Sequence, residues 1–376
     1  MKIIDLKTTL LYAPFKEDIS DAARKISGRD VLLIEIFTDE GVTGLGFLTG
    51  LGVAFGSEMQ VINTIIEKGL KPMVIGQDPF NFERLWDMMY RGTTRYGRKG
   101  AAVRAISGVD MTIWDLIGKK TNTPVYKLLG GYSDRIKVYA SGGFYTERND
   151  ISELVGEMEG YIDQGFKAIK MKVGKDVVFD SKRVEAVRKA IGEEIDLLID
   201  ANEAWDFNTA LRFIKAVEQY NIYWLEEPVA PDDIEGFINL TKFSSIPIAG
   251  GENEYTKYGF KDLITRKAVN VVQPDVTRVG GISEWMKVAA MARAWNMPCV
   301  THAVQEVHIS LVTAISNAPM MEYFTRQHYL QTFLSDLFVE PATLHNVANG
   351  YVYAPEAPGL GLKVDTDLVK KYKVNY

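Results

Sequence analysis

Charged residues recur at a nearly constant interval through the second half of the chain, each at the end of a short apolar segment. Successive members of this series stand about 20–28 residues apart. An interval of this length accommodates one strand and one helix, and repeated strand–helix units that close into a barrel bring their strand ends together at one face, where barrel enzymes carry their active sites. We therefore predict that the series forms one site. Its members are Lys170 and Lys172, Asp200, Glu226, Glu252, Asp275, His302 and Glu322.

Three carboxylates of the series come from three successive predicted strands. Asp200, Glu226 and Glu252 would repel one another in a crowded site, and a divalent cation removes that repulsion. Ligation by oxygen alone suits Mg²⁺. We predict that these three residues bind Mg²⁺ and that Asn202 lines the site. Glu227 is predicted to point away from the metal and to support the ligands from behind. The alternative is three solvated loop acids.

The lysines stand two positions apart on one strand, so their side chains project to the same side. Two ammonium groups held close together disfavour each other's charge, and this lowers the pKa of one of them towards neutrality. We predict Lys172 as a general base and Lys170 as its electrostatic partner. A solvated lysine pair is the alternative.

A second acid–base pair is predicted from neighbouring strands. A carboxylate such as Asp275 beside the imidazole of His302 fixes the tautomer of the ring and favours its protonated form. His302 is thereby predicted to be a general acid, unless it is a structural core histidine, the role expected of His308. Glu322 is predicted to donate a hydrogen bond to substrate if it is protonated; otherwise it is a structural acid at a strand end.

The elements that must position these residues can be traced from residue 136 onward. Short apolar strands alternate there with amphipathic helices, which predicts parallel strands with right-handed connections. A closed barrel is favoured over an open doubly wound sheet, which would usually show a glycine-rich turn after its first strand. Before this region, residues 31–47 read as a hairpin rather than a phosphate loop, and residues 101–120 as a helix. The barrel strands are predicted at 136–140, 168–173, 195–199, 222–225, 246–249, 269–272, 297–300 and 320–324.

Length and composition limit the remaining possibilities. The chain has 376 residues, of which 47% are hydrophobic and 24% charged, with a formal net charge of −6. We predict an N-terminal domain at 1–130, a barrel at 136–335 and a tail at 340–376 that packs back on the first domain. The single cysteine, Cys299, excludes an intrachain disulfide. The net charge disfavours nucleic acid as a partner. We expect a cytoplasmic, homo-oligomeric enzyme without a membrane segment or an organic cofactor.

Several segments together are similar to motifs of the enolase superfamily, within its mandelate racemase-like subgroup. The resemblance implies an α/β fold, a modified (β/α)7β TIM barrel capped by an α+β domain from both chain ends. It also implies Mg²⁺ on the three carboxylates and abstraction of the proton α to a substrate carboxylate, through an enediolate. The segments are 109–119 with 128–131, 170–172, 224–228, 250–253, 273–275 with 280–282, 301–302 and 358–361.

The subgroup that the sequence resembles contains racemases and many acid-sugar dehydratases. Residues 272–282, which include Arg278, and residues 305–308 look most like the dehydratases of aldonates and aldarates. We predict a sugar-acid dehydratase that yields a 2-keto-3-deoxy acid. A racemase or epimerase of a 2-hydroxy acid and a non-catalytic carboxylate-binding barrel are the alternatives. Substrate choice is expected to lie in residues 18–29 and 48–56. The basic run of Arg91, Arg95, Arg98, Lys99 and Arg104 is expected to cover a domain or subunit interface, with binding of an anion as the alternative.

Overall fold

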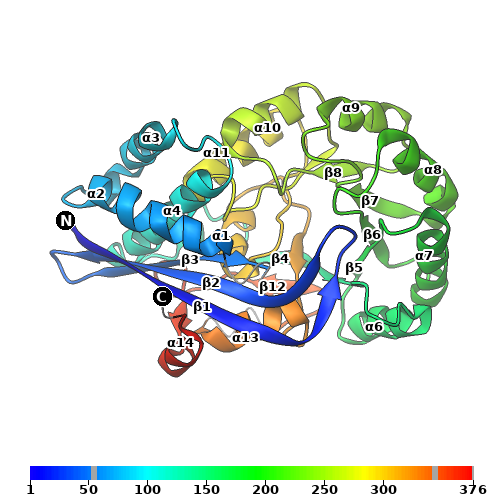
Figure 1. Cartoon of the computed structure of the whole chain (residues 1–376), viewed down its shortest axis with the longest axis horizontal. Helices are drawn as coiled ribbons and strands as arrows, with labels where there is room; N and C mark the ends of the chain where they lie inside the picture. Colours follow the sequence, from blue (N-terminus) through cyan, green and yellow to red (C-terminus); the bar gives the residue numbers. More distant parts are fainter. Residues whose placement is uncertain (52–56, 341–345, 375–376) are drawn as a thin grey trace.

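The computed structural model describes residues 1–51, 57–340 and 346–374. An N-terminal part, blue to cyan, lies beside a larger part that runs from green to orange (Figure 1). No helix of the described ranges is both long and apolar enough to cross a membrane.

A three-stranded antiparallel sheet forms the N-terminal part, with strand order β1-β2-β3. Residues 31–47 form the predicted hairpin, in which Phe37 pairs with Thr43. Helix α4 packs so closely on β3 that a Cβ at Gly44 or Gly46 would lie within 2.4 Å of Thr112. Two of the glycines that loosely resemble a phosphate loop therefore serve helix–sheet packing. The elements are β1 (Ile3–Ser20), β2 (Lys25–Thr38), β3 (Thr43–Gly50), α1 (Ser57–Thr64), α2 (Lys71–Val74), α3 (Phe82–Thr93), α4 (Ala101–Lys120) and α5 (Val125–Leu128).

The larger part is the predicted parallel barrel. Seven strands follow the order β10-β4-β5-β6-β7-β8-β9, and every pair on this path is parallel. The strands are β4 (Arg135–Gly142), β5 (Ala168–Lys172), β6 (Asp196–Asp200), β7 (Ile222–Glu226), β8 (Ile248–Gly250), β9 (Val271–Val272) and β10 (Met321–Tyr323). The helices are α6 (Ile151–Asp163), α7 (Val177–Ile191), α8 (Phe207–Val217), α9 (Ile234–Phe243), α10 (Thr256–Thr265), α11 (Gly281–Ala294), α12 (Gln305–Val312) and α13 (Tyr329–Leu337).

The prediction of a strand at 297–300 is wrong. Only an isolated bridge joins Cys299 to Val272 there. Pro298 has no N–H to donate, which prevents a regular ladder. Its carbonyl oxygen still accepts a hydrogen bond from Val272 N at 3.1 Å, and Val300 N donates to Val272 O at 2.9 Å. The segment therefore follows the course of a barrel strand and delivers the next residues to the same face.

An apolar layer fills the barrel beneath the ends of its strands. Strand side chains alternate between faces, so residues two apart point to the same side. Leu198 stands two residues before Asp200, and Trp224 two before Glu226. The charged series therefore lies directly above a layer that excludes water. The layer consists of Tyr139, Ala168, Leu198, Trp224, Ala249, Val271, Val300 and Met320.

The C-terminal tail contacts both parts of the molecule. Strand β12 (Tyr351–Tyr353) pairs antiparallel with β4 of the barrel, and helix α14 (Thr366–Tyr372) packs on β1. Strand β11 (Phe338–Glu340) pairs with β13 (Lys363–Val364). The predicted tail includes residues 341–345 and 375–376, which lie outside the described ranges. The three domain boundaries stay a prediction.

The buried carboxylate of Asp115 joins three segments of the chain. It accepts hydrogen bonds from Leu45 N at 2.7 Å and from Leu360 N at 2.8 Å, and it pairs with Lys119 at 2.7 Å. Strand β3, helix α4 and the tail therefore depend on a single side chain.

We expect Asp115→Ala to lower the free energy of unfolding by about 2–4 kcal/mol, because it leaves two buried backbone N–H groups without an acceptor. Chemical denaturation followed by circular dichroism measures the change. Asp367→Ala, which removes an exposed carboxylate on α14, is the control and should change stability by less than about 0.5 kcal/mol. Equal stability of the two variants would contradict the assignment.

Candidate active site

The register of three neighbouring strands sets the central row of the site. Lys172 on β5 is paired with Asp200 on β6, and Asp200 with Glu226 on β7. Lys172 Nζ donates to Asp200 Oδ2 at 2.6 Å, and Lys170 Nζ donates to Glu226 Oε1 at 2.8 Å. Lys170 Nζ also lies 2.7 Å from Glu322 Oε1. The two lysines thus share one side of β5, as predicted, and each is paired with a carboxylate.

The three predicted metal ligands converge. One carboxylate oxygen each of Asp200, Glu226 and Glu252 lies within 4.8 Å of the others, and all three residues are buried. Glu252 Oε2 receives no hydrogen bond, whereas Glu226 Oε2 is held by Gln273 Nε2 at 2.8 Å. Burial and the charge of Asp200 raise the pKa of Glu226 to about 7. The cluster therefore lacks positive charge, and its all-oxygen donor set fits a hard divalent cation.

The prediction that the lysine pair lowers the pKa of Lys172 is wrong for this arrangement. Burial and Lys170 act in that direction, but Asp200 outweighs them and the pKa of Lys172 is raised. The sequence argument counted the neighbouring ammonium and not the carboxylate across the sheet. A cation bound to Asp200 would withdraw that carboxylate from Lys172 and favour loss of the proton.

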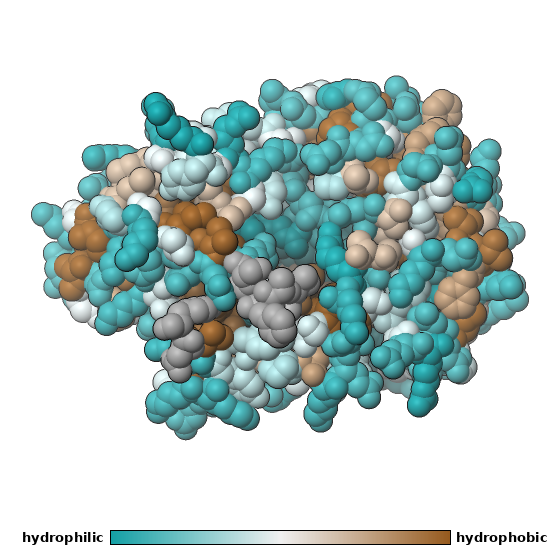
Figure 2. All heavy atoms as spheres, viewed as in Figure 1, coloured by the Kyte–Doolittle hydropathy of each residue, from teal (hydrophilic) through white to brown (hydrophobic). Residues whose placement is uncertain are grey.

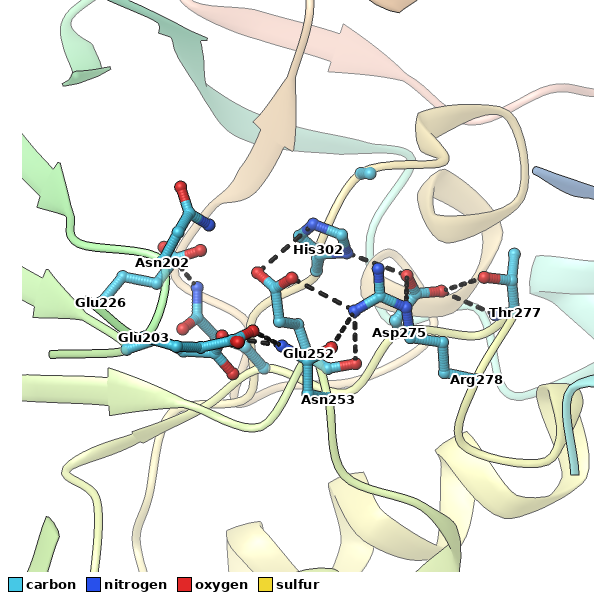
Figure 3. Close-up of polar contacts among 12 residues, drawn as sticks. Asn202, Glu203, Glu226, Glu252, Asn253, Asp275, Thr277, Arg278 and His302 are labelled. Atoms are coloured by element: carbon cyan, nitrogen blue, oxygen red, sulfur yellow. Dashed lines mark hydrogen bonds and ion pairs between the residues drawn. The ribbon is translucent and has the colours of Figure 1, made fainter. Parts of the chain in front are cut away.

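His302 lies between two carboxylates (Figure 3). Its Nδ1 is 2.8 Å from Asp275 Oδ2, and its Nε2 is 3.3 Å from Glu252 Oε2. Burial would lower the pKa of His302, but Glu252 and Asp275 raise it overall. The predicted pair is therefore formed in space, and both carboxylates favour the protonated form of the imidazole, which is the form that a general acid needs.

Glu322 differs from the expectation of a protonated donor. Burial would raise its pKa, but Lys170 lowers it to about 2. The carboxylate is thus ionised, pairs with Lys170 and accepts a hydrogen bond from Ala303 N at 2.6 Å. It cannot donate a hydrogen bond in this state. His308 is structural, as expected: its Nε2 accepts from Val276 N at 3.0 Å.

Residues that were not predicted as site residues hold the ligands in place. Arg278 Nη1 contacts Glu252 Oε1 at 3.1 Å and Asn253 Oδ1 at 2.7 Å (Figure 3). Asn253 Nδ2 in turn donates to Glu203 Oε1 at 2.5 Å. The sequence offered one indication of Asn253, its position directly after the predicted ligand Glu252. It offered no comparable indication of Glu203. Asn202 lies at the site with its Oδ1 unpartnered.

A cavity of about 390 Å³ opens between the two parts of the molecule. Hydrophilic residues line a hollow at this place (Figure 2). The barrel contributes Lys172, Asn202, Glu252, Asp275, His302 and Glu322 to its wall. Residues 18–29 and 48–51 contribute as predicted, and residues 52–56 lie outside the described ranges. Arg104 is buried on the wall of this cavity between the two parts, and Lys99 of the same basic run pairs with Glu254 of the barrel, which agrees with the expected place of the run at a domain interface.

The fold and the site define a barrel enzyme whose buried carboxylates hold a divalent metal. The profile of the mandelate racemase/muconate lactonizing enzyme N-terminal domain matches residues 8–130, and that of the enolase C-terminal domain-like family matches residues 153–368. The chain belongs to the mandelate racemase/muconate lactonizing enzyme family of the enolase superfamily.

Its relatives carry more than one activity. An arabinonate dehydratase of Saccharolobus solfataricus is 35% identical over 92% of this chain and 91% of its own length. A 3,6-anhydro-alpha-L-galactonate cycloisomerase of Streptomyces coelicolor is 32% identical over 98% of this chain and 99% of its own. The crystal structure of a racemase from Streptomyces coelicolor A3(2) with bound magnesium has a TM-score of 0.91 and 31% identity, and covers 99% of this chain and 100% of that chain. The cluster of Asp200, Glu226 and Glu252 is accordingly a Mg²⁺ site.

We expect Mg²⁺ affinity to fall by up to about tenfold per pH unit below pH 7. The pKa of Glu226 is raised to about 7, so at lower pH this carboxyl carries a proton that Mg²⁺ must displace. Titration calorimetry at pH 6 and pH 8 measures the difference.

Variants of two neighbouring acids provide the control. Glu252→Gln removes a ligand and should weaken Mg²⁺ binding at both pH values, whereas Glu254→Gln alters an acid that pairs with Lys99 and should bind as the parent does. Affinity that is independent of pH, or equal in the two variants, would contradict the assignment.

Proposed function

We propose that this enzyme dehydrates a sugar acid to a 2-keto-3-deoxy acid. The observation that carries the proposal is the placement of Lys172 and of His302, which contacts Asp275, on one cavity beside a Mg²⁺ site. Lys172 ends β5, and His302 follows the segment beside β9, at the other end of the β5–β9 strand order. A substrate in the cavity would thus meet a base and an acid on different sides. The identity to an arabinonate dehydratase supports the same reaction class.

The first step of the proposal is removal of the proton α to the substrate carboxylate. Mg²⁺ supplies the positive charge that stabilises negative charge on the carboxylate oxygens. Lys172 would take this proton as a neutral amine, so its ammonium group must first release a proton to solvent, which loss of the ion pair with Asp200 favours. Lys170 is fully buried and is not on the cavity wall, so we assign it to positioning Glu226 and Glu322 rather than to contact with substrate.

The second step is departure of the hydroxyl group on the neighbouring carbon. His302 delivers a proton to the leaving oxygen, and well-placed acid catalysis of this kind contributes roughly 10²–10⁴-fold. Asp275 holds Nδ1, while Thr277 N and Oγ1 each donate to Asp275 Oδ1 at 2.7 Å. The orientation of the ring is therefore secured by two layers of hydrogen bonds.

A racemase or epimerase of a 2-hydroxy acid is the second candidate. Two proton-transfer groups on different sides of a substrate also suit inversion at the α-carbon, and the racemase structure shares the fold over nearly the whole chain. The two reactions differ in the fate of the hydroxyl group. Substrate identity and a homo-oligomeric state stay predictions.

We expect acid sugars incubated with the Mg²⁺-loaded enzyme to give 2-keto-3-deoxy acids, because the enol formed by loss of water tautomerises to a ketone. Trapping with a carbonyl reagent, followed by mass spectrometry, measures the product. Boiled enzyme and the Lys172→Ala variant are the controls. Inversion at the α-carbon without trapped ketone in every active substrate would replace the dehydratase assignment by the racemase.

We expect Lys172→Ala and His302→Asn to fail at different steps. Lys172→Ala should abolish exchange of the substrate α-proton with deuterated water, because it removes the base. His302→Asn should lower ketone formation by at least about 100-fold and retain exchange, because only the leaving group lacks its proton. Proton NMR measures exchange. The opposite pattern would reverse the two roles, and full activity of both variants would remove them from the mechanism.

A further inference from the structure

The end of the cavity on the N-terminal side contains a buried cation that forms no direct ion pair within the described ranges. Arg29 on β2 is 4% exposed and lies on the cavity wall. Its Nη2 donates to Thr49 Oγ1 at 3.2 Å, and its Nε has no hydrogen-bond partner. Within the described ranges no carboxylate lies at ion-pair distance from Arg29, and Glu306, Asp275 and Asp30 act on it only from farther away. A buried unpaired charge costs free energy, and such a group persists where a ligand completes it.

A second arginine points to the same place. Arg104 on α4 donates from Nη2 to the carbonyl oxygen of Thr49 at 2.6 Å, and its Nε is also unpartnered. Both guanidinium groups therefore converge on Thr49, near the end of β3. Burial lowers the pKa of Arg29 only to about 10, so it stays charged at neutral pH.

Two acids on the cavity wall at this end are engaged with other partners. Glu58 pairs with Arg104, and Asp21 accepts hydrogen bonds from Ala23 N at 2.8 Å and Arg24 N at 2.6 Å. Arg24 in turn pairs with Glu203 at 2.9 Å. Arg29 is thus a buried cation that no carboxylate of the described ranges contacts at ion-pair distance, although Glu306, Asp275 and Asp30 act on its charge from farther away.

We propose that Arg29, supported by Arg104, binds a terminal carboxylate of the substrate, so that the enzyme acts on dicarboxylic acid sugars in preference to monocarboxylic ones. The inference rests on the proposed function for the reacting end of the substrate. One carboxylate lies at the Mg²⁺ site, and the other forms charge-assisted hydrogen bonds with the Arg29 guanidinium, whose planar fork matches a carboxylate. A terminal hydroxyl group in this place would leave the buried charge unpaired. The cavity of about 390 Å³ joins the two ends and is of the size that small ligands occupy.

The test compares acid sugars in matched pairs of equal carbon number and configuration, such as galactarate with galactonate, on the Mg²⁺-loaded enzyme. We expect kcat/KM to favour the diacid by at least tenfold. Arg29→Gln should lower kcat/KM for the diacid by about 10–100-fold and for the monoacid by less than threefold. Arg29→Lys should retain part of the preference.

The ratio between two substrates within one variant does not depend on the folded fraction of the protein. Arg188→Gln, which alters a buried arginine of α7 bonded to backbone carbonyls, is the control and should keep the parent ratio.

Measurements of substrate binding distinguish a failure of this inference from a failure of the proposed reaction. Calorimetry with the Mg²⁺-loaded Lys172→Ala variant measures affinity for the same pairs without turnover. Tighter binding of diacids that is lost in Lys172→Ala/Arg29→Gln would support the subsite even if no dehydration occurs. Dehydration without an Arg29-dependent preference would overturn the subsite and leave the reaction intact. Preference for a 6-phosphoaldonate over the diacid would assign the subsite to a phosphate and overturn the carboxylate.

Discussion

The crowding of like charges at one end of a narrow barrel is the constraint on which the rest of the site depends. The sheet register places Asp200 beside Glu226, and both are fully buried. Carboxylates this close are stable only when cations offset their charge. Lys170 and Lys172 supply part of this positive charge from the adjacent strand, while burial and the remaining repulsion from Asp200 raise the pKa of Glu226.

The apolar layer beneath these residues strengthens the interactions between their charges. Trp224 and Leu198 fill the barrel two residues before the ligands on the same strands, so water cannot screen the charges from below. In this environment the protonation of Lys172 depends strongly on its partner. Asp200, the carboxylate that favours the protonated form of Lys172, is also a ligand of the metal. Under the proposed function, binding of the cation and activation of Lys172 as the base are thus linked through Asp200.

The N-terminal part of the molecule forms one side of the cavity, and we assign none of its residues to proton transfer. The β1–β2 hairpin reaches across to the barrel face (Figure 1), where Arg24 pairs with Glu203 of the loop after β6. Close packing of α4 on the glycines of β3 brings Arg104 to the same space as Arg29. We infer that the barrel determines which bond of the substrate reacts and that the N-terminal sheet determines which end group is accepted.

The sequence by itself determined the repeating strand–helix order, the metal ligands and the Asp275–His302 pair, because each depends on a local pattern or on a repeat that closure brings to one face. Only the tertiary structure decided what depends on partners from distant segments. The segment at 297–300 is not a strand, since Pro298 interrupts its hydrogen bonds. The pKa of Lys172 is raised because Asp200 lies across the sheet, and Glu322 is ionised because Lys170 pairs with it. The burial of Arg29 and Arg104 on one cavity likewise needs β2, α4 and the barrel together. The protonation state of a buried side chain depends on all the charged groups that surround it in space. The spacing of residues along the sequence predicts only those neighbours that a regular strand–helix repeat brings together.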